Sequence, residues 1–180
     1  MTNSANNAQA PAAALPIFVG GIDVRMLHHI HIIVEDIETV RKAYEGVPGV
    51  DNMEVHDIRK FNGALALMVR TKPVSIEYLQ ITDPTIGMAR LLKDAPLGLN
   101  AIDLLVSDGD AAVEQAKAAG YILTGKMRFF GCWEIWLRHP KLELNIEFMV
   151  PTPPGYKKIP NDKPEVWIYG LDGTEDLYFS

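Results

Sequence analysis

Three residues of this chain carry side chains that could bind a divalent cation. His29 lies in a β-rich run, and Glu77 and Glu147 are each a lone acid within an apolar run. A buried carboxylate on such a strand is costly unless an opposite charge compensates it. A divalent metal would supply that charge, and one histidine with two carboxylates is a suitable donor set. Arg70 and Arg138 are the alternative partners of the two acids.

Alternation along the strands decides which side chains can meet these three. His29 and His31 point to one face of their strand, whereas the other face carries the apolar Ile30, Ile32 and Val34. The apolar face is expected to pack against helices, which leaves the histidines on the concave side. By the same parity, Asp103 shares the concave side in the second half of the chain. His31 and Asp103 could act as proton-transfer groups, Asp103 could bind the metal, or both could be structural.

The elements that must position these residues come from an internal repeat. Residues 29–36 align with 101–108, residues 61–63 with 129–131, and residues 75–79 with 145–149, a lag of about 70 residues. Each copy begins with a strand, continues into a helix capped by Asp36 or Asp108, and ends with three short strands. The sequence therefore predicts an α+β fold in which two tandem βαβββ modules form a cupped, partly closed mixed sheet with the helices outside.

The repeat also divides the chain. Residues 1–24 are expected to form a flexible leader, 25–96 the first module with a bridging helix near 88–93, and 97–151 the second module. We place the strands near 27–34, 55–58, 64–70, 75–81, 100–106, 122–127, 132–138 and 144–150. Residues 152–180 read as a proline-rich arm and not as a packed element, and the last few resemble a protease site left from an expression vector.

Composition excludes several classes of function. A net charge of -6 without a basic cluster argues against a nucleic-acid partner. No apolar run reaches the roughly 18 residues that a membrane span needs. Cys132 is the only cysteine, so no intrachain disulfide can form, and a reducing cytoplasm is the expected compartment.

Residues 27–38, LHHIHIIVEDIE, resemble the opening strand of the vicinal oxygen chelate superfamily, and residues 145–151, NIEFMVP, resemble its last strand. This superfamily includes glyoxalase I, methylmalonyl-CoA epimerase, extradiol dioxygenases and the bleomycin-resistance binding proteins, and the resemblance covers roughly 26–151, closest to epimerase-like and glyoxalase-like members. It implies that His29, Glu77 and Glu147 bind a divalent metal (Zn, Co, Ni, Mn or Fe). The usual fourth ligand position is Ala101, which cannot bind one.

The resemblance implies a metal-dependent isomerase, epimerase or lyase that chelates a small oxygenated substrate and moves a proton next to a carbonyl. Glu147, His31 and Asp103 are the expected catalytic residues. Homodimers are common in the superfamily and are expected here. The loss of a ligand at Ala101 makes a metal-free small-molecule binding protein the alternative, and an Fe(II) extradiol dioxygenase a less favoured one. Four aromatic residues are expected to line the substrate site: Phe61, Phe129, Phe130 and Trp133.

Overall fold

The computed structural model describes residues 17–19, 22–129, 132–142, 144–151, 165–169 and 177–179. The first module consists of β2 (Ile22–Ile33), α1 (Ile37–Ala43), β3 (Val50–Asp57), α2 (Arg59–Asn62), β4 (Ala64–Thr71) and β5 (Ser75–Ile81), and α3 (Ala89–Leu92) follows it. The second module consists of β6 (Gly98–Val106), α4 (Gly109–Ala118), β7 (Ile122–Phe129), β8 (Cys132–Arg138) and β9 (Asn145–Pro151). Three further strands are β1 (Ile17–Val19), β10 (Glu165–Ile168) and β11 (Leu177–Phe179).

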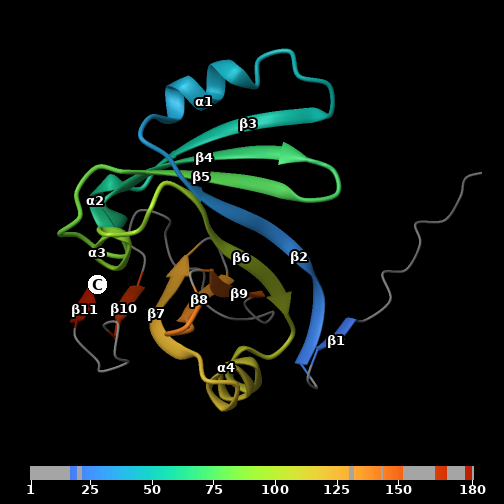
Figure 1. The fold of residues 1–180 in the computed structure, drawn as a ribbon, viewed down its shortest axis with the longest axis vertical. Helices are drawn as coiled ribbons and strands as arrows, with labels where there is room; N and C mark the ends of the chain where they lie inside the picture. The colour runs from blue at the N-terminus through green and yellow to red at the C-terminus, as the bar shows by residue number, and fades with distance from the viewer. Residues whose placement is uncertain are drawn as a thin grey trace, which may run out of the picture.

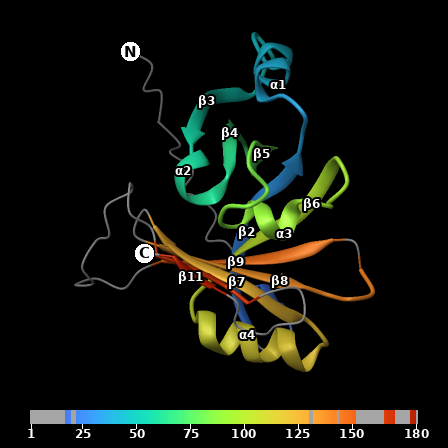
Figure 2. The same cartoon turned by 90° about the vertical axis from the view of Figure 1, so that its left-hand side faces the viewer.

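The two modules have the same topology and meet along their first strands. The strand order is β11-β10-β7-β8-β9-β6-β2-β5-β4-β3, with β1 also paired to β2. Each module therefore orders its strands first, fourth, third, second, and β2 pairs with β6 in antiparallel fashion. Figures 1 and 2 show α1 and α4 on the outer sides of the two halves of the curved sheet. This arrangement confirms the predicted α+β fold.

Each module has a hydrophobic core between its helix and its part of the sheet. Asp36 and Asp108 cap the two helices, because their carboxylates accept hydrogen bonds from backbone N–H groups in the first turn. Burial of the helix faces then holds each helix to its half-sheet. The core of the first module contains Ile37, Leu67, Val69 and Tyr78, and that of the second contains Val106, Ala112, Val113, Ala116, Ile135, Leu137 and Phe148. Since the helices cover the outer faces, the inner faces are left for a site.

Five strands differ from the sequence prediction. β3 begins at Val50, well before the predicted 55, because the sheet edge lets its first half carry polar, exposed side chains. β2 begins at Ile22, inside the expected leader. β10 pairs with β7 and β11 with β10, so these parts of the predicted arm are strands of the sheet. β1 also lies inside the expected leader and pairs with β2. Apart from Tyr169, the other residues of the leader and the arm lie outside the described residues.

A buried amide holds α3 beside the sheet. The Asn62 side chain is 7% exposed, and its Oδ1 accepts a hydrogen bond from the backbone N–H of Met88 at 2.7 Å. Met88 directly precedes α3 and packs with Met127 and Trp136 of the second module. This contact therefore joins the first module to the segment that lies between the two modules.

Replacing Asn62 with alanine should lower the free energy of unfolding by about 1 to 2 kcal/mol, because the Met88 N–H would be left buried without its partner. Urea denaturation measures this loss. Asn52→Ala is the control, since the Asn52 side chain makes its contacts at the exposed surface and its loss should cost under about 0.5 kcal/mol. Equal losses for the two variants would contradict the proposed anchoring.

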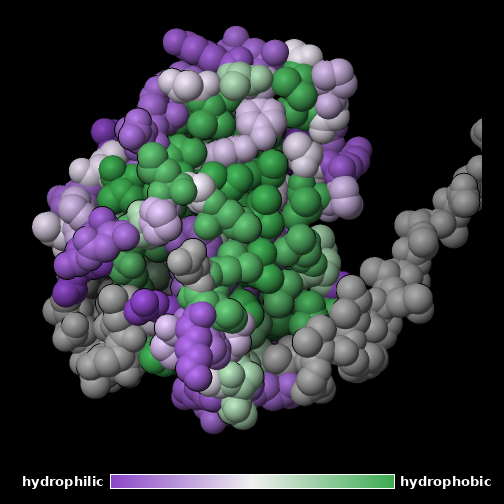
Figure 3. Space-filling view, viewed as in Figure 1, coloured by the Kyte–Doolittle hydropathy of each residue, from purple (hydrophilic) through white to green (hydrophobic). Residues whose placement is uncertain are grey.

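One face of the molecule is markedly apolar. Figure 3 shows hydrophobic residues gathered across the middle of this face, over the region of β2, β5 and β6. Leu27 of β2 is 39% exposed and Leu99 of β6 is 56% exposed. Surfaces of this kind often contact other chains, and the homodimer stays a prediction. Among the described residues, no helix is long and apolar enough to cross a membrane.

Candidate metal centre and substrate pocket

The four central strands of the sheet bring the predicted ligands into adjacent positions. In the order β9, β6, β2 and β5, the strand register pairs Glu147 with Asp103, Asp103 with His29, and His31 with Glu77. The remaining pair joins His31 directly to Ala101. The imidazole of His31 therefore lies beside Ala101, the position where the superfamily resemblance places a fourth ligand.

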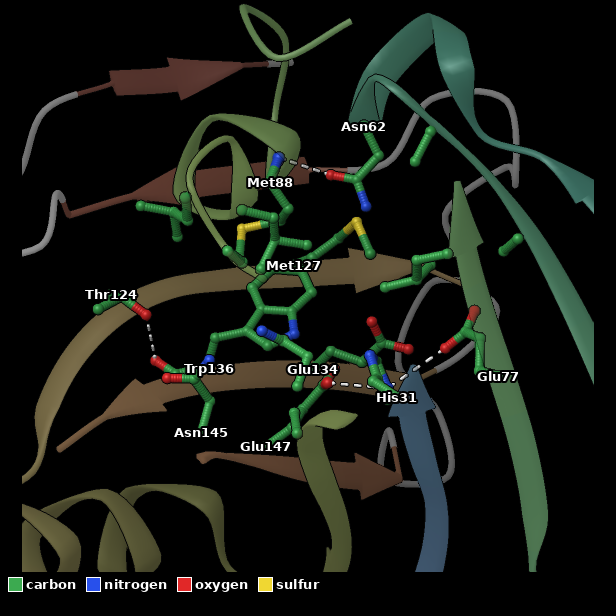
Figure 4. Close-up of a pocket in the computed structure, with 18 of the residues that line it drawn as sticks. His31, Asn62, Glu77, Met88, Thr124, Met127, Glu134, Trp136, Asn145 and Glu147 are labelled. Carbon is green, nitrogen blue, oxygen red and sulfur yellow. Dashed lines mark hydrogen bonds and ion pairs between the residues drawn. The ribbon is translucent and has the colours of Figure 1, made fainter. Parts of the chain in front are cut away.

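Four donor atoms converge at this point. The Nε2 atom of His29 lies 3.1 Å from Oε2 of Glu77, and Nε2 of His31 lies 3.2 Å from the same oxygen. The Nε2 atom of His31 is also 3.1 Å from Oε2 of Glu147 and 2.5 Å from Nε2 of His29. Figure 4 shows the carboxylates of Glu77 and Glu147 approaching His31 from two sides. All four side chains are buried except Glu77, which is 16% exposed.

This donor set fits a divalent metal. Both carboxylate oxygens of Glu147 are buried, and Oε2 lies 3.1 Å from Nε2 of His31, so the carboxylate faces the other donor atoms. Ligands bound tetrahedrally at about 2.0 to 2.1 Å lie about 3.3 Å from one another. Three of the four separations given above are close to that value, and the two histidine nitrogens would have to move apart. Two imidazoles and two carboxylates suit Zn, Fe, Co, Ni or Mn better than they suit hard cations, which prefer oxygen ligands.

Asp103 lies behind His29 and not between the four converging donor atoms. Its Oδ2 is 3.0 Å from Nδ1 of His29 and 3.2 Å from Nδ1 of His28, and the carboxylate is fully buried. A carboxylate in this position fixes the tautomer of a histidine, so that Nε2 presents its lone pair to a metal. Asp103 does not line the large cavity that His29, His31, Glu77 and Glu147 line. The geometry thus favours an orienting role over the expected catalytic one.

The two histidines differ in protonation when no metal is bound. Burial opposes a charge on His29, but hydrogen bonds with Asp103 and Glu77 outweigh burial and raise the His29 pKa to about 10. Burial lowers the pKa of His31 to about 4, and the charge of His29 acts in the same direction. His29 can therefore donate a proton toward a neutral His31 in the short contact between their Nε2 atoms.

The acids of the centre are shifted in opposite directions. Burial favours the neutral form of Glu77, but the charges of His31 and His29 outweigh it and lower the Glu77 pKa to about 2. Burial and the neighbouring carboxyl of Glu134 raise the pKa of Glu147 well above its usual value. The metal-free centre thus holds protons on both a histidine and a glutamate that a metal would need unprotonated.

Binding of Zn2+ at pH 7 should therefore release at least one proton, because His29 is protonated below its pKa of about 10. For each proton released, the apparent affinity should rise by about tenfold per pH unit between pH 6 and 8. Calorimetric titration in two buffers with different ionisation enthalpies counts the protons. Binding without proton release, together with an affinity that does not vary with pH, would contradict the assigned protonation states.

The centre lies in the wall of a cavity of about 1120 Å3 that both modules and α3 line. Alternation on β8 places Glu134 and Trp136 toward the cavity, whereas Ile135 and Leu137 belong to the core of the second module. Figure 4 shows Glu134 beside His31 and Glu147, with Trp136 and Met127 farther along the cavity. Burial and neighbouring acids raise the pKa of Glu134 well above its usual value.

The predicted aromatic wall differs from the observed one. Phe61 packs with Met88 and Met127 but does not line the cavity, and Trp133 lies on the side of β8 away from it, with Arg128 over its ring. Trp136 takes the place that was expected for Trp133. Phe130 and the side chain of Phe129 lie outside the described residues. Arg70, one alternative partner of the acids, pairs instead with Glu54 at 3.3 Å.

Comparison with known proteins identifies the family. The sequence pattern of the Glyoxalase/Bleomycin resistance protein/Dioxygenase superfamily matches residues 28–133, more than half of the chain. The chain belongs to this superfamily. Its members are the vicinal oxygen chelate proteins, and the match includes His29, His31, Glu77 and Asp103. No curated protein matches the chain closely enough to count as a relative.

Solved structures with the vicinal oxygen chelate fold agree with the assignment. A hypothetical protein from Bacillus halodurans C-125 superimposes with a TM-score of 0.58 at 19% identity, covering 73% of this chain and 98% of its own. Methylmalonyl-CoA epimerase from Mycobacterium tuberculosis gives 0.56 at 22%, with 76% and 94% covered. A Streptomyces coelicolor methylmalonyl-CoA epimerase in complex with 2-nitronate-propionyl-CoA gives 0.52 at 19%, with 72% and 99% covered. At these identities the likeness shows the fold.

Proposed function

We propose that this chain is a metal-dependent isomerase of the vicinal oxygen chelate type, with a lyase as the related alternative reaction. The observation that carries the proposal is the convergence of four donor groups, from the buried His29, His31 and Glu147 and the partly exposed Glu77, on one wall of a large cavity. These side chains would hold the metal. His31 thereby replaces the ligand that Ala101 cannot provide.

When bound, a divalent metal polarises a carbonyl oxygen of the substrate and makes the neighbouring C–H bond more acidic. Glu134 is our proposed proton-transfer group, because its carboxyl is buried in the cavity wall next to Glu147. A bound cation would lower the raised pKa of Glu134, and the resulting carboxylate could take a proton from the substrate carbon and return it to the same or a neighbouring position. Trp136, Met127 and Met88 form an apolar section of the wall that excludes water from the reacting group.

Deuterium exchange tests this proposal directly. The structural neighbours include epimerases of methylmalonyl-CoA, so this thioester is the first substrate to try. Protein loaded with Zn2+, Co2+, Ni2+, Mn2+ or Fe2+ should exchange the proton between the two carbonyl groups with solvent D2O, and metal-free protein should not. If none of the metals is bound in stoichiometric amount, the isomerase proposal is wrong and the metal-free binding protein replaces it.

Replacing Glu134 with glutamine should lower this exchange rate by about 100-fold or more while metal content stays unchanged. Glutamine keeps the size of the side chain but cannot accept and return a proton. Mass spectrometry follows the exchange, and elemental analysis reports the metal. A Glu134→Gln variant that keeps full activity would remove Glu134 from the mechanism.

The dioxygenase alternative gains one observation from the structure. His29, His31 and Glu147 form a group of two histidines and one carboxylate within ligand distance of one another, which is the set that Fe(II) dioxygenases use. Glu77 would occupy a further position that oxygen and substrate need, so the isomerase remains favoured. Oxygen consumption by the Fe2+-loaded protein with a catechol would support the dioxygenase instead.

The cellular setting completes the proposal. We propose a cytoplasmic protein, because Cys132 is its only cysteine and no intrachain disulfide holds the fold. A homodimer is consistent with the apolar face in Figure 3. Size-exclusion chromatography with light scattering measures the oligomeric state.

A further inference from the structure

Arg90 lines the same cavity but takes no part in the metal centre. It lies on α3, the segment that Asn62 anchors between the two modules. Its Nη1 atom is buried, and it finds no hydrogen-bond partner in the described part of the chain. A buried guanidinium nitrogen without an acceptor is costly, so its presence in a cavity wall calls for an explanation.

Two other basic groups of the cavity wall contrast with Arg90. Arg70 pairs with Glu54, and the ammonium of Lys93 lies 3.8 Å from Asp94. Both side chains are well exposed, at 44% for Arg70 and 58% for Lys93. Water can therefore satisfy their remaining donors. At Arg90, the buried nitrogen has no acceptor among the described residues.

We propose that Arg90 binds the anionic group of the substrate, either a carboxylate or a phosphate. A guanidinium presents paired N–H donors that match the oxygens of both groups. The acids of the metal centre come from the strands of the sheet, whereas Arg90 comes from α3 across the cavity. A ligand with polar oxygens at one end and an anion at the other would satisfy both regions.

The inference rests on the proposed function, because it assumes that the oxygen-bearing end of the ligand lies at the metal centre. The size of the cavity, about 1120 Å3, is sufficient for a ligand that reaches both groups. Arg90 would then select anionic substrates over neutral ones of the same length. Its role is recognition of the substrate and not transfer of the proton.

Calorimetric titration of the metal-free protein with succinate and with inorganic phosphate tests the anion site without involving the metal. The wild type should bind at least one of these anions, and Arg90→Met should weaken that binding by roughly tenfold or more. Lys93→Met is the matched control, since it removes one positive charge from the same wall and should change the affinity by less than about twofold. The anion affinity of Arg90→Lys should lie between those of the wild type and Arg90→Met, because lysine keeps the charge and loses the paired donors.

The two probes identify the anion. Binding of succinate alone indicates a carboxylate, and binding of phosphate alone indicates a phosphate group. If the wild type binds neither, or if Arg90→Met and Lys93→Met weaken binding equally, the assignment of Arg90 is wrong. The two proposals can fail separately, because this titration uses metal-free protein. If the protein binds the anion through Arg90 but cannot bind a metal, the proposed function is wrong and the anion site stands.

Discussion

Replacing His31 with alanine is expected to lower the affinity of the protein for Zn2+ by roughly 100-fold or more. Loss of a group that merely orients a ligand costs 10- to 100-fold, and His31 contributes a donor atom itself. Its Nε2 lies within 3.2 Å of Glu77 and Glu147 and closer still to His29. Competition with a chromophoric chelator measures the affinity. The same variant should lose metal-dependent exchange of the substrate proton.

Two further variants make this prediction specific. His28→Ala removes the adjacent histidine, which contacts Asp103 and the Nδ1 atom of His29 but none of the converging donor atoms, so it should cost about tenfold at most. His31→Ala/Ala101→His moves the imidazole to the paired position on β6, where the superfamily resemblance places a ligand. The double variant should recover most of the lost affinity. Equal losses for His28→Ala and His31→Ala, with no recovery, would show that His31 is not a ligand.

Replacing Glu147 with glutamine should weaken metal binding and also make the metal-free protein more stable at pH 8. The Glu147 pKa is raised above its usual 4.5, so the carboxyl favours folding at low pH and this contribution is lost as the pH rises through the raised value. A neutral amide avoids that loss. We expect a gain on the order of 1 kcal/mol in the free energy of unfolding, measured by urea denaturation in metal-free buffer.

Glu77→Gln is the matched control, because Glu77 has the equivalent place in the first module. Its pKa is lowered to about 2, so its carboxylate stabilises the fold above pH 4.5 and loses this effect only as the pH falls toward 2. Glu77→Gln should therefore weaken metal binding as Glu147→Gln does, yet destabilise the metal-free protein at pH 8 by about 2 to 3 kcal/mol. Stability changes of the same sign for the two variants would contradict the charge assignment.

The fold could be predicted from the sequence because the same helix and strand signals occur in both copies of the internal repeat. Asp36 and Asp108 each precede a helix, and the apolar runs that follow predict the inner strands of both modules. Prediction was weaker where tertiary contacts decide the structure. The first half of β3 is polar at an exposed edge, and β10 becomes a strand through its pairing with β7. Neither feature has a distinctive hydrophobic pattern.

The candidate site was only partly predictable, for a reason that lies in strand register. His29, Glu77 and Glu147 follow from their isolated positions in apolar runs and from the superfamily resemblance. The contribution of His31 depends on its pairing with Ala101, which the sequence does not specify because β2 and β6 have register shifts on both sides of this pair. A second histidine two positions after His29, opposite a small residue, was the available signal.

The cavity wall shows the same limit. Glu134 and Trp136 share one face of β8, but the sequence alone does not say which face turns inward, since both faces carry large apolar side chains. Trp133 was therefore placed in the wall instead of Trp136. No feature of the sequence indicated a role for Arg90, because that role depends on the burial of its Nη1 atom beside a cavity that only the assembled modules form.

X-ray absorption spectroscopy of the Zn2+-loaded protein tests the central claim most directly, because it counts the ligands by type. Four side chains from β2, β5 and β9 should give two imidazole nitrogens, from His29 and His31, together with carboxylate oxygens at about 2.0 to 2.1 Å. The His31→Ala variant, loaded with excess Zn2+, should show one imidazole. A wild-type spectrum with a single imidazole, or a protein that retains no stoichiometric metal, would contradict this account.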